Sequence, residues 1–73
     1  MRRYSAVLFR DPDTGQQTVT VPALPGCYTM GATEAEALAN AQEAIRLYLA
    51  DMKASGEPIP TEESPPRVVC VEV

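Results

Sequence analysis

The first part of the chain alternates apolar and polar positions in a way that predicts a β-hairpin. Residues 3–10 read RYSAVLFR and carry apolar side chains on both faces, so we expect a well-covered strand. Residues 11–15 read DPDTG and combine residue types that favour a tight turn. Residues 16–22 alternate threonine with valine up to Pro22, which cannot donate to a ladder and ends the strand or marks an edge. A short third strand at 27–30 is expected to turn back along the second.

Residues 33–54 have the pattern of one long amphipathic helix. Thr33 and Glu36 fit a capping box, in which the Thr33 hydroxyl accepts the amide hydrogen of Glu36 and the Glu36 side chain reaches back to the Thr33 amide. Lys53 suits the last turn and Gly56 the C-terminal cap. The apolar stripe expected to face the sheet consists of Leu38, Ala41, Ile45, Tyr48, Leu49 and Met52.

Leu47 falls on the far side of that stripe. It is either one exposed leucine, which is common on protein surfaces, or a contact point in an oligomer.

The last part of the chain contains an acidic, proline-rich stretch followed by a valine-rich one. Residues 57–66, EPIPTEESPP, predict an extended linker. Residues 67–73, RVVCVEV, predict a final strand that pairs parallel to the first strand through a right-handed crossover. The expected fold is therefore α+β, a single domain over residues 1–73 in a β-β-β-α-β two-layer sandwich, with one helix packed on the sheet.

Composition limits the range of functions. The chain has 73 residues and a net charge of −4, which argues against nonspecific binding to nucleic acid. That charge is ordinary for a soluble protein, and it also suits a basic partner. Its apolar runs are too short for a signal peptide or a membrane span, so we expect a cytoplasmic protein that does not bind membranes. In that compartment Cys27 and Cys70 are expected to be reduced.

The inventory of catalytic groups is almost empty, which favours a binding module over an enzyme. The chain has no histidine, and no base accompanies Cys27. Asp11 and Asp13 would need further oxygen ligands to hold a metal, and turn chemistry explains them well enough. We therefore expect no cofactor and no metal. The weakest alternative is a metal-dependent hydrolase or nuclease that uses Asp11, Asp13 and Glu72.

The order and spacing of several motifs resemble the HicB family of antitoxins, in its N-terminal toxin-binding domain. The resemblance runs from about Tyr4 to Pro60. Its most specific part is the proline-glycine-cysteine loop joined to a T-x-x-E-A helix start. The residues that carry it are Tyr4, Asp13, Gly15, Val19 to Pro22, Leu24 to Cys27, Thr29, Gly31, Thr33, Glu36 to Leu38, Asn40, Ala41, Ala44, Ile45, Leu49, Gly56, Ile59 and Pro60.

The resemblance implies a partial RNase H-like fold and a cytoplasmic prokaryotic protein that forms homo-oligomers. It also implies a partner, a HicA-type toxin, which is a small basic RNase with a catalytic histidine. The antitoxin would bind this toxin and cover its active site. Family proteins usually carry a C-terminal DNA-binding domain as well. This sequence ends at Val73 without one, so no direct nucleic-acid binding is expected of it.

The loop at residues 22–32 is the candidate partner-binding site. Its prolines and glycines fix the backbone, and rigid backbone loses less entropy on binding. The expected contacts are Leu24, Pro25, Gly26, Cys27, Tyr28 and Thr29. Two alternatives remain open: the loop simply carries the chain from the sheet to the helix, or the protein is an orphan homo-oligomeric adaptor without a toxin.

Overall fold

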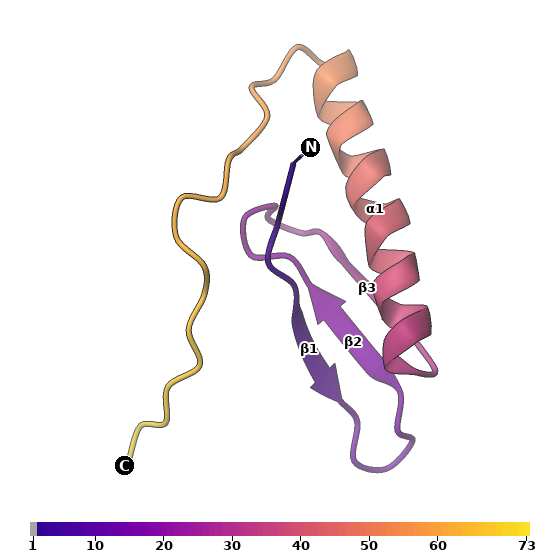
Figure 1. Ribbon diagram of the computed structural model, residues 1–73, viewed down its shortest axis with the longest axis vertical. Coiled ribbons are helices and arrows are strands. Elements are labelled where there is room, and N and C mark those ends of the chain that lie inside the picture. The colour runs from indigo at the N-terminus through magenta and orange to yellow at the C-terminus, as the bar shows by residue number, and fades with distance from the viewer. Residues whose placement is uncertain (1) are drawn as a thin grey trace.

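The computed structural model describes residues 2–73 and contains three strands and one helix (Figure 1). The strands are β1, Val7–Arg10; β2, Gln17–Thr20; and β3, Tyr28–Gly31; the helix is α1, Glu34–Ala54. The strands form an antiparallel sheet in the order β1-β2-β3, and α1 packs against β2 and β3. The expected α+β fold with three antiparallel strands and one long helix is confirmed. Met1, which the expected domain includes, lies outside the described residues.

The register of the sheet is set by the hairpin between β1 and β2. Val7 lies opposite Thr20 and Arg10 opposite Gln17. In the turn, the Asp11 amide donates to the Gln16 carbonyl at 2.8 Å, and the Asp11 carboxylate accepts from the Asp13 amide at 2.8 Å. Asp11 therefore caps the turn with its side chain, as aspartates in turns commonly do.

The core lies between the sheet and α1 in two adjoining clusters. The first consists of Val19, Ala37 and Ala41, with Ala6 and Leu8 against it. The second consists of Val21, Leu24 and Cys27, with Tyr4, Ala44, Ile45, Tyr48 and Leu49 against it. The expected apolar stripe is corrected at its start, because Ala37 is buried where Leu38 was expected.

This correction follows from how closely the helix approaches β3. A Cβ atom built on Gly31 would lie 2.7 Å from the Ala37 Cα, so no side chain fits at Gly31. A small residue is therefore needed on both elements where they cross, and the larger Leu38 is displaced to the side.

Both ends of α1 are capped by local hydrogen bonds. The Thr33 hydroxyl accepts from the Glu36 amide at 3.1 Å. The Glu36 carboxylate accepts from the Ala32 amide at 3.3 Å and not from the Thr33 amide that the capping box predicted. At the other end Gly56 has a φ of 73°, and the next amide, of Glu57, donates to the Met52 carbonyl at 2.9 Å. This arrangement is a Schellman motif.

The fourth strand expected at residues 67–73 is not formed, since the structure assigns neither helix nor strand to residues 57–73. Figure 1 shows this segment as an extended tail that runs beside the start of the chain in the same direction as β1. Two contacts hold its first part. The Tyr4 hydroxyl donates to the Pro60 carbonyl at 2.6 Å, and the Glu62 carboxylate accepts from the amide and the hydroxyl of Ser5 at 2.7 and 2.6 Å.

None of the helices in the described part of the chain has the length and apolar character needed to cross a membrane.

Candidate partner-binding face

The helix covers one face of the sheet and leaves the other face uncovered. Leu8 and Val19 point toward α1, so the alternating positions along each strand point away from it. Three large apolar side chains on the uncovered side are accessible to solvent: Phe9 at 58%, Tyr28 at 65% and Met30 at 48%. The open face, as the name is used below, consists of Val7, Phe9, Thr18, Thr20, Tyr28 and Met30.

The sheet register arranges this open face in two rows. Phe9 lies opposite Thr18, which lies opposite Met30, and the neighbouring row runs from Val7 through Thr20 to Tyr28. Each row thus begins and ends with an apolar side chain and has a threonine between them. The expectation that the first strand is covered on both faces is wrong, because a single helix can cover only one.

The loop before β3 is built from successive tight turns. The Leu24 amide donates to the Val21 carbonyl at 2.9 Å, and the Cys27 amide donates to the Leu24 carbonyl at 2.9 Å. Gly26 has a φ of 81°, which only glycine adopts readily. The Tyr48 hydroxyl of α1 donates to the Pro25 carbonyl at 2.7 Å and holds the tip of the loop against the helix. The backbone of this loop is therefore fixed from both sides.

The structure divides the predicted loop contacts into inward and outward residues. Leu24 and Cys27 are buried in the core, Thr29 is half-buried, and Pro25, Gly26 and Tyr28 are exposed. Leu24 and Cys27 therefore support the loop from beneath, and the accessible contacts come from its tip and from Tyr28.

Tyr28 and Leu47 meet in one shallow depression of about 520 Å³. Leu47 is 64% exposed, and the acidic Asp51 lies at the same depression. The structure thus brings together two features that the sequence suggested separately, the loop and the leucine outside the helical stripe. The residues that line the depression are Gly26, Cys27, Tyr28, Ala44, Leu47, Tyr48 and Asp51.

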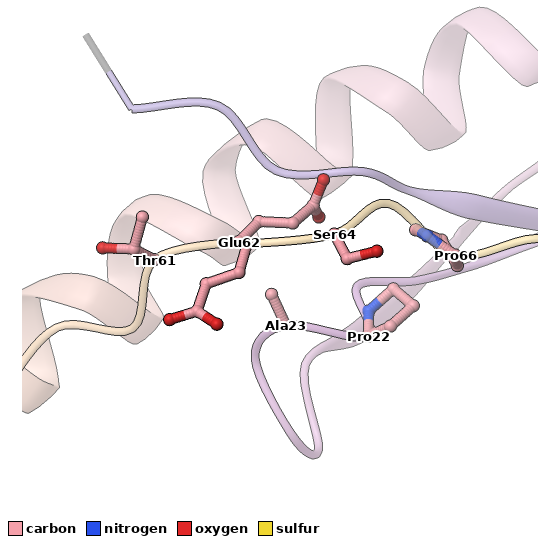
Figure 2. Close-up of a pocket in the computed structure, with 7 residues that line it drawn as sticks. Pro22, Ala23, Thr61, Glu62, Ser64 and Pro66 are labelled. Atoms are coloured by element: carbon pink, nitrogen blue, oxygen red, sulfur yellow. The ribbon is translucent and has the colours of Figure 1, made fainter.

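The start of the loop borders the tail. Figure 2 shows Pro22 and Ala23 facing the segment that carries Thr61, Glu62 and Ser64, across a cavity of about 360 Å³. Because the tail lies over this side of the loop, the side left free for a partner is the one that carries Tyr28.

The remaining candidate chemistry is explained by structure. Burial raises the pKa of the Cys27 thiol, which keeps it protonated and a poor nucleophile. The Asp11 carboxylate is engaged within its turn. Among residues 2–73, no three metal-ligating side chains gather into a cluster.

Sequence reasoning missed Phe9 and Met30 as candidate contacts. A signal was present, because residues 3–10 are apolar on both faces in a chain with only one helix to cover them. A small α+β domain with a fixed loop and an uncovered apolar face has the features of a protein-interaction module.

The family model described as "HicB_like antitoxin of bacterial toxin-antitoxin system" matches residues 4–69. The chain belongs to this family. It is 45% identical to a UPF0150 protein of Thermoplasma acidophilum over 62 residues, which are 85% of this chain and 88% of that protein. It is 37% identical to a UPF0150 protein of Synechocystis over 60 residues, 82% of this chain and 75% of that protein. No solved structure matches the chain.

Proposed function

We propose that this protein is a cytoplasmic antitoxin that binds a HicA-type toxin, a small basic RNase, and covers its active site. Membership in the HicB-like antitoxin family supports the role. The observation that carries the binding surface is the row of exposed apolar side chains on the open face, beside a loop whose backbone is already fixed.

The toxin-binding surface consists of the loop tip, the Tyr28 depression and the adjoining open face. Tyr28 is the expected anchor, because tyrosine is enriched at residues that dominate binding energy. Pro25 and Gly26 present backbone that loses little entropy on binding. Leu47, which the sequence offered as an oligomer contact, adjoins Tyr28, so we assign it to this same surface.

Charge favours the approach of a basic partner. The chain carries ten acidic and six basic residues, and Asp51 borders the Tyr28 depression. Complementary charge mainly accelerates association and disfavours wrong partners, while the buried apolar contacts supply affinity. Inhibition in this mode is by occlusion, and it asks no chemistry of the antitoxin's own side chains.

The proposal is tested with the HicA-type toxin encoded beside this gene. Co-expression of the chain should restore growth to cells that produce the toxin, and calorimetry should show tight binding to a toxin whose catalytic histidine is replaced. Tyr28→Ala should weaken that binding at least about tenfold, the scale of a hot-spot contact.

Asp13→Ala is the matched control, because Asp13 lies exposed in the hairpin turn away from Tyr28. It should leave binding unchanged. The same variant tests the hydrolase alternative, which requires metal-dependent nuclease activity that Asp13→Ala abolishes. Absence of any binding between the unchanged chain and the toxin would overturn the proposal and leave the orphan homo-oligomeric adaptor.

A further inference from the structure

An apolar groove lies between the start of the chain and α1, apart from the toxin-binding surface. It has a volume of about 570 Å³, with Leu38, Ile45 and Leu49 among the apolar residues that line it. Three arginines also border it: Arg2, Arg3 and Arg46. We call it the arginine-rimmed groove. In the described chain it is open to solvent on the side of Leu38, which is exposed.

The end of the tail is an exposed segment with strong strand-forming character. Residues 67–73 contain four valines, of which Val68 is 93% and Val71 79% exposed. In an extended conformation Val69, Val71 and Val73 share one side, and Val68, Cys70 and Glu72 share the other. Within residues 2–73, no backbone hydrogen bond between main-chain groups involves a residue after Glu57. This segment therefore has the composition of a strand without the partners of one.

The chain's own β1 cannot take this segment as the tail is placed. Glu62 is held at Ser5, and the tail and β1 run in the same direction (Figure 1). Extended chains advance about 3.3 Å per residue, so Arg67 comes level with Arg10, each five residues beyond the Glu62–Ser5 contact. Residues 68–73 then run past the last residue of β1.

Prolines occupy the stretch of tail that does run along β1. Pro65 and Pro66 fall level with Leu8 and Phe9 in the same count of residues. Proline has no amide hydrogen, so this stretch is unsuited to forming a ladder. The tail can accompany its own β1 without pairing with it.

The outer edge of β1 remains free in each copy. The Asp11–Gln16 bond makes that pair a hydrogen-bonded one, so by alternation Phe9 and Val7 bond to β2, while the amides of Leu8 and Arg10 face outward. An exposed edge of this kind is a template for an added strand.

We propose that residues 67–73 of one copy add as a strand to the β1 edge of a second copy, with Val69 and Val71 over the arginine-rimmed groove. Each copy holds one donor segment and one acceptor edge, so reciprocal exchange closes a two-fold dimer. The arginines of the acceptor complement Glu72 of the donor. A chain of 73 residues also gains most from an oligomer, because its own core is small. This inference does not depend on the proposed toxin.

The first experiment measures the molar mass of the full chain by size exclusion with light scattering. The unchanged chain should have twice the chain mass, and the Val69→Asp/Val71→Asp double variant should have the single mass. At least a tenfold rise in the dimer dissociation constant is expected. Both valines are exposed, so the variant should retain the circular dichroism and melting of the monomer fold. Leu47→Asp, an equally exposed apolar residue on the far side of α1, is the matched control and should remain dimeric.

A mixing experiment separates strand exchange from any other dimer. Leu38→Asp alters the acceptor groove and should also weaken the dimer. A mixture of Leu38→Asp with the Val69→Asp/Val71→Asp chain contains one intact donor and one intact acceptor, so it should form a heterodimer that neither variant forms alone. The inference is overturned if the unchanged chain is monomeric at several hundred micromolar, if the double valine variant dimerises normally, or if the mixture stays monomeric.

Discussion

The two faces of the sheet have similar apolar character but different surroundings. On the face toward α1, Leu8 and Val19 pack against the small helical residues Ala37 and Ala41. On the open face, Phe9, Tyr28 and Met30 are larger and meet solvent. With a single helix, this small domain can bury only one of them. The difference indicates that the covered face determines whether the chain folds, while the open face is available for a partner.

The matched pair Leu24→Ala and Leu47→Ala tests this division most directly. Leu24 is fully buried on the helix side, and its truncation should lower the free energy of unfolding by about 2–5 kcal/mol. Leu47 is exposed, and the same substitution there should change stability by less than about 0.5 kcal/mol. Urea denaturation followed by circular dichroism measures both. Equal losses would show that the far side of the helix is covered in solution.

Two glycines give a second comparison. At Gly31 an added methyl group would overlap the backbone of Ala37, so Gly31→Ala should cost about 1–3 kcal/mol by forcing β3 and α1 apart. At Gly26 an added methyl group meets nothing within 4 Å, and only the positive φ opposes it. Gly26→Ala should therefore cost about 1 kcal/mol. A larger loss at Gly26 than at Gly31 in thermal melting would contradict the close helix–strand approach.

The helix and the hairpin could be predicted from the sequence because their signals are local. The alternation around residues 16–22 and the Thr33–Glu36 cap each depend on neighbours within one or two turns of chain. The burial of Ala37 in place of Leu38 could not be predicted in this way, because it depends on how closely α1 crosses Gly31. Helical periodicity identifies an apolar side but does not decide which residue on it approaches the sheet most closely.

The tail and the binding face were harder to predict for a related reason. RVVCVEV has every local property of a strand, but its pairing depends on where Glu62 holds the tail against Ser5. The loop was recognised from its prolines and glycines. Which of its side chains point outward depends on the buried Leu24 and Cys27, and thus on the core beneath the loop.

Thr33→Ala should have a smaller effect than either core change. It removes the hydroxyl that accepts from the Glu36 amide at 3.1 Å, and N-cap losses of this kind cost about 1 kcal/mol. Glu34→Gln, which leaves the cap bond in place, is the control. A loss at Glu34 equal to that at Thr33 would assign the effect to the helix dipole and not to the cap.

Substitution on the open face should hardly change folding. Met30→Thr retains a strand-forming residue and continues the threonines of its row, so stability should change by less than about 0.5 kcal/mol. Toxin affinity measured by calorimetry should fall in the same variant. A variant with reduced stability and unchanged affinity would place Met30 with the covered face and remove it from the proposed binding surface.

The smallest expected effect is at the edge of the sheet, where acid should release the tail. Hydrogen bonds from the hydroxyl and the amide of Ser5 lower the pKa of the Glu62 carboxyl. Because the folded pKa lies below the unfolded one, this contact contributes its full stability above the ordinary pKa of a glutamate. The contribution is lost as the pH falls through the lowered folded value.

NMR measures this release at one amide, since the Ser5 N–H donates directly to the Glu62 carboxylate. Its chemical shift should titrate with a midpoint below that of an unperturbed glutamate. In Glu62→Gln the shift should no longer titrate. In Glu63→Gln, which alters the neighbouring acid, the titration should persist. Global stability should change little, because the carboxylate is accessible to solvent and such contacts are weak. A Ser5 shift that still titrates in Glu62→Gln would separate the tail from this edge, and with it the register that carries residues 68–73 beyond β1.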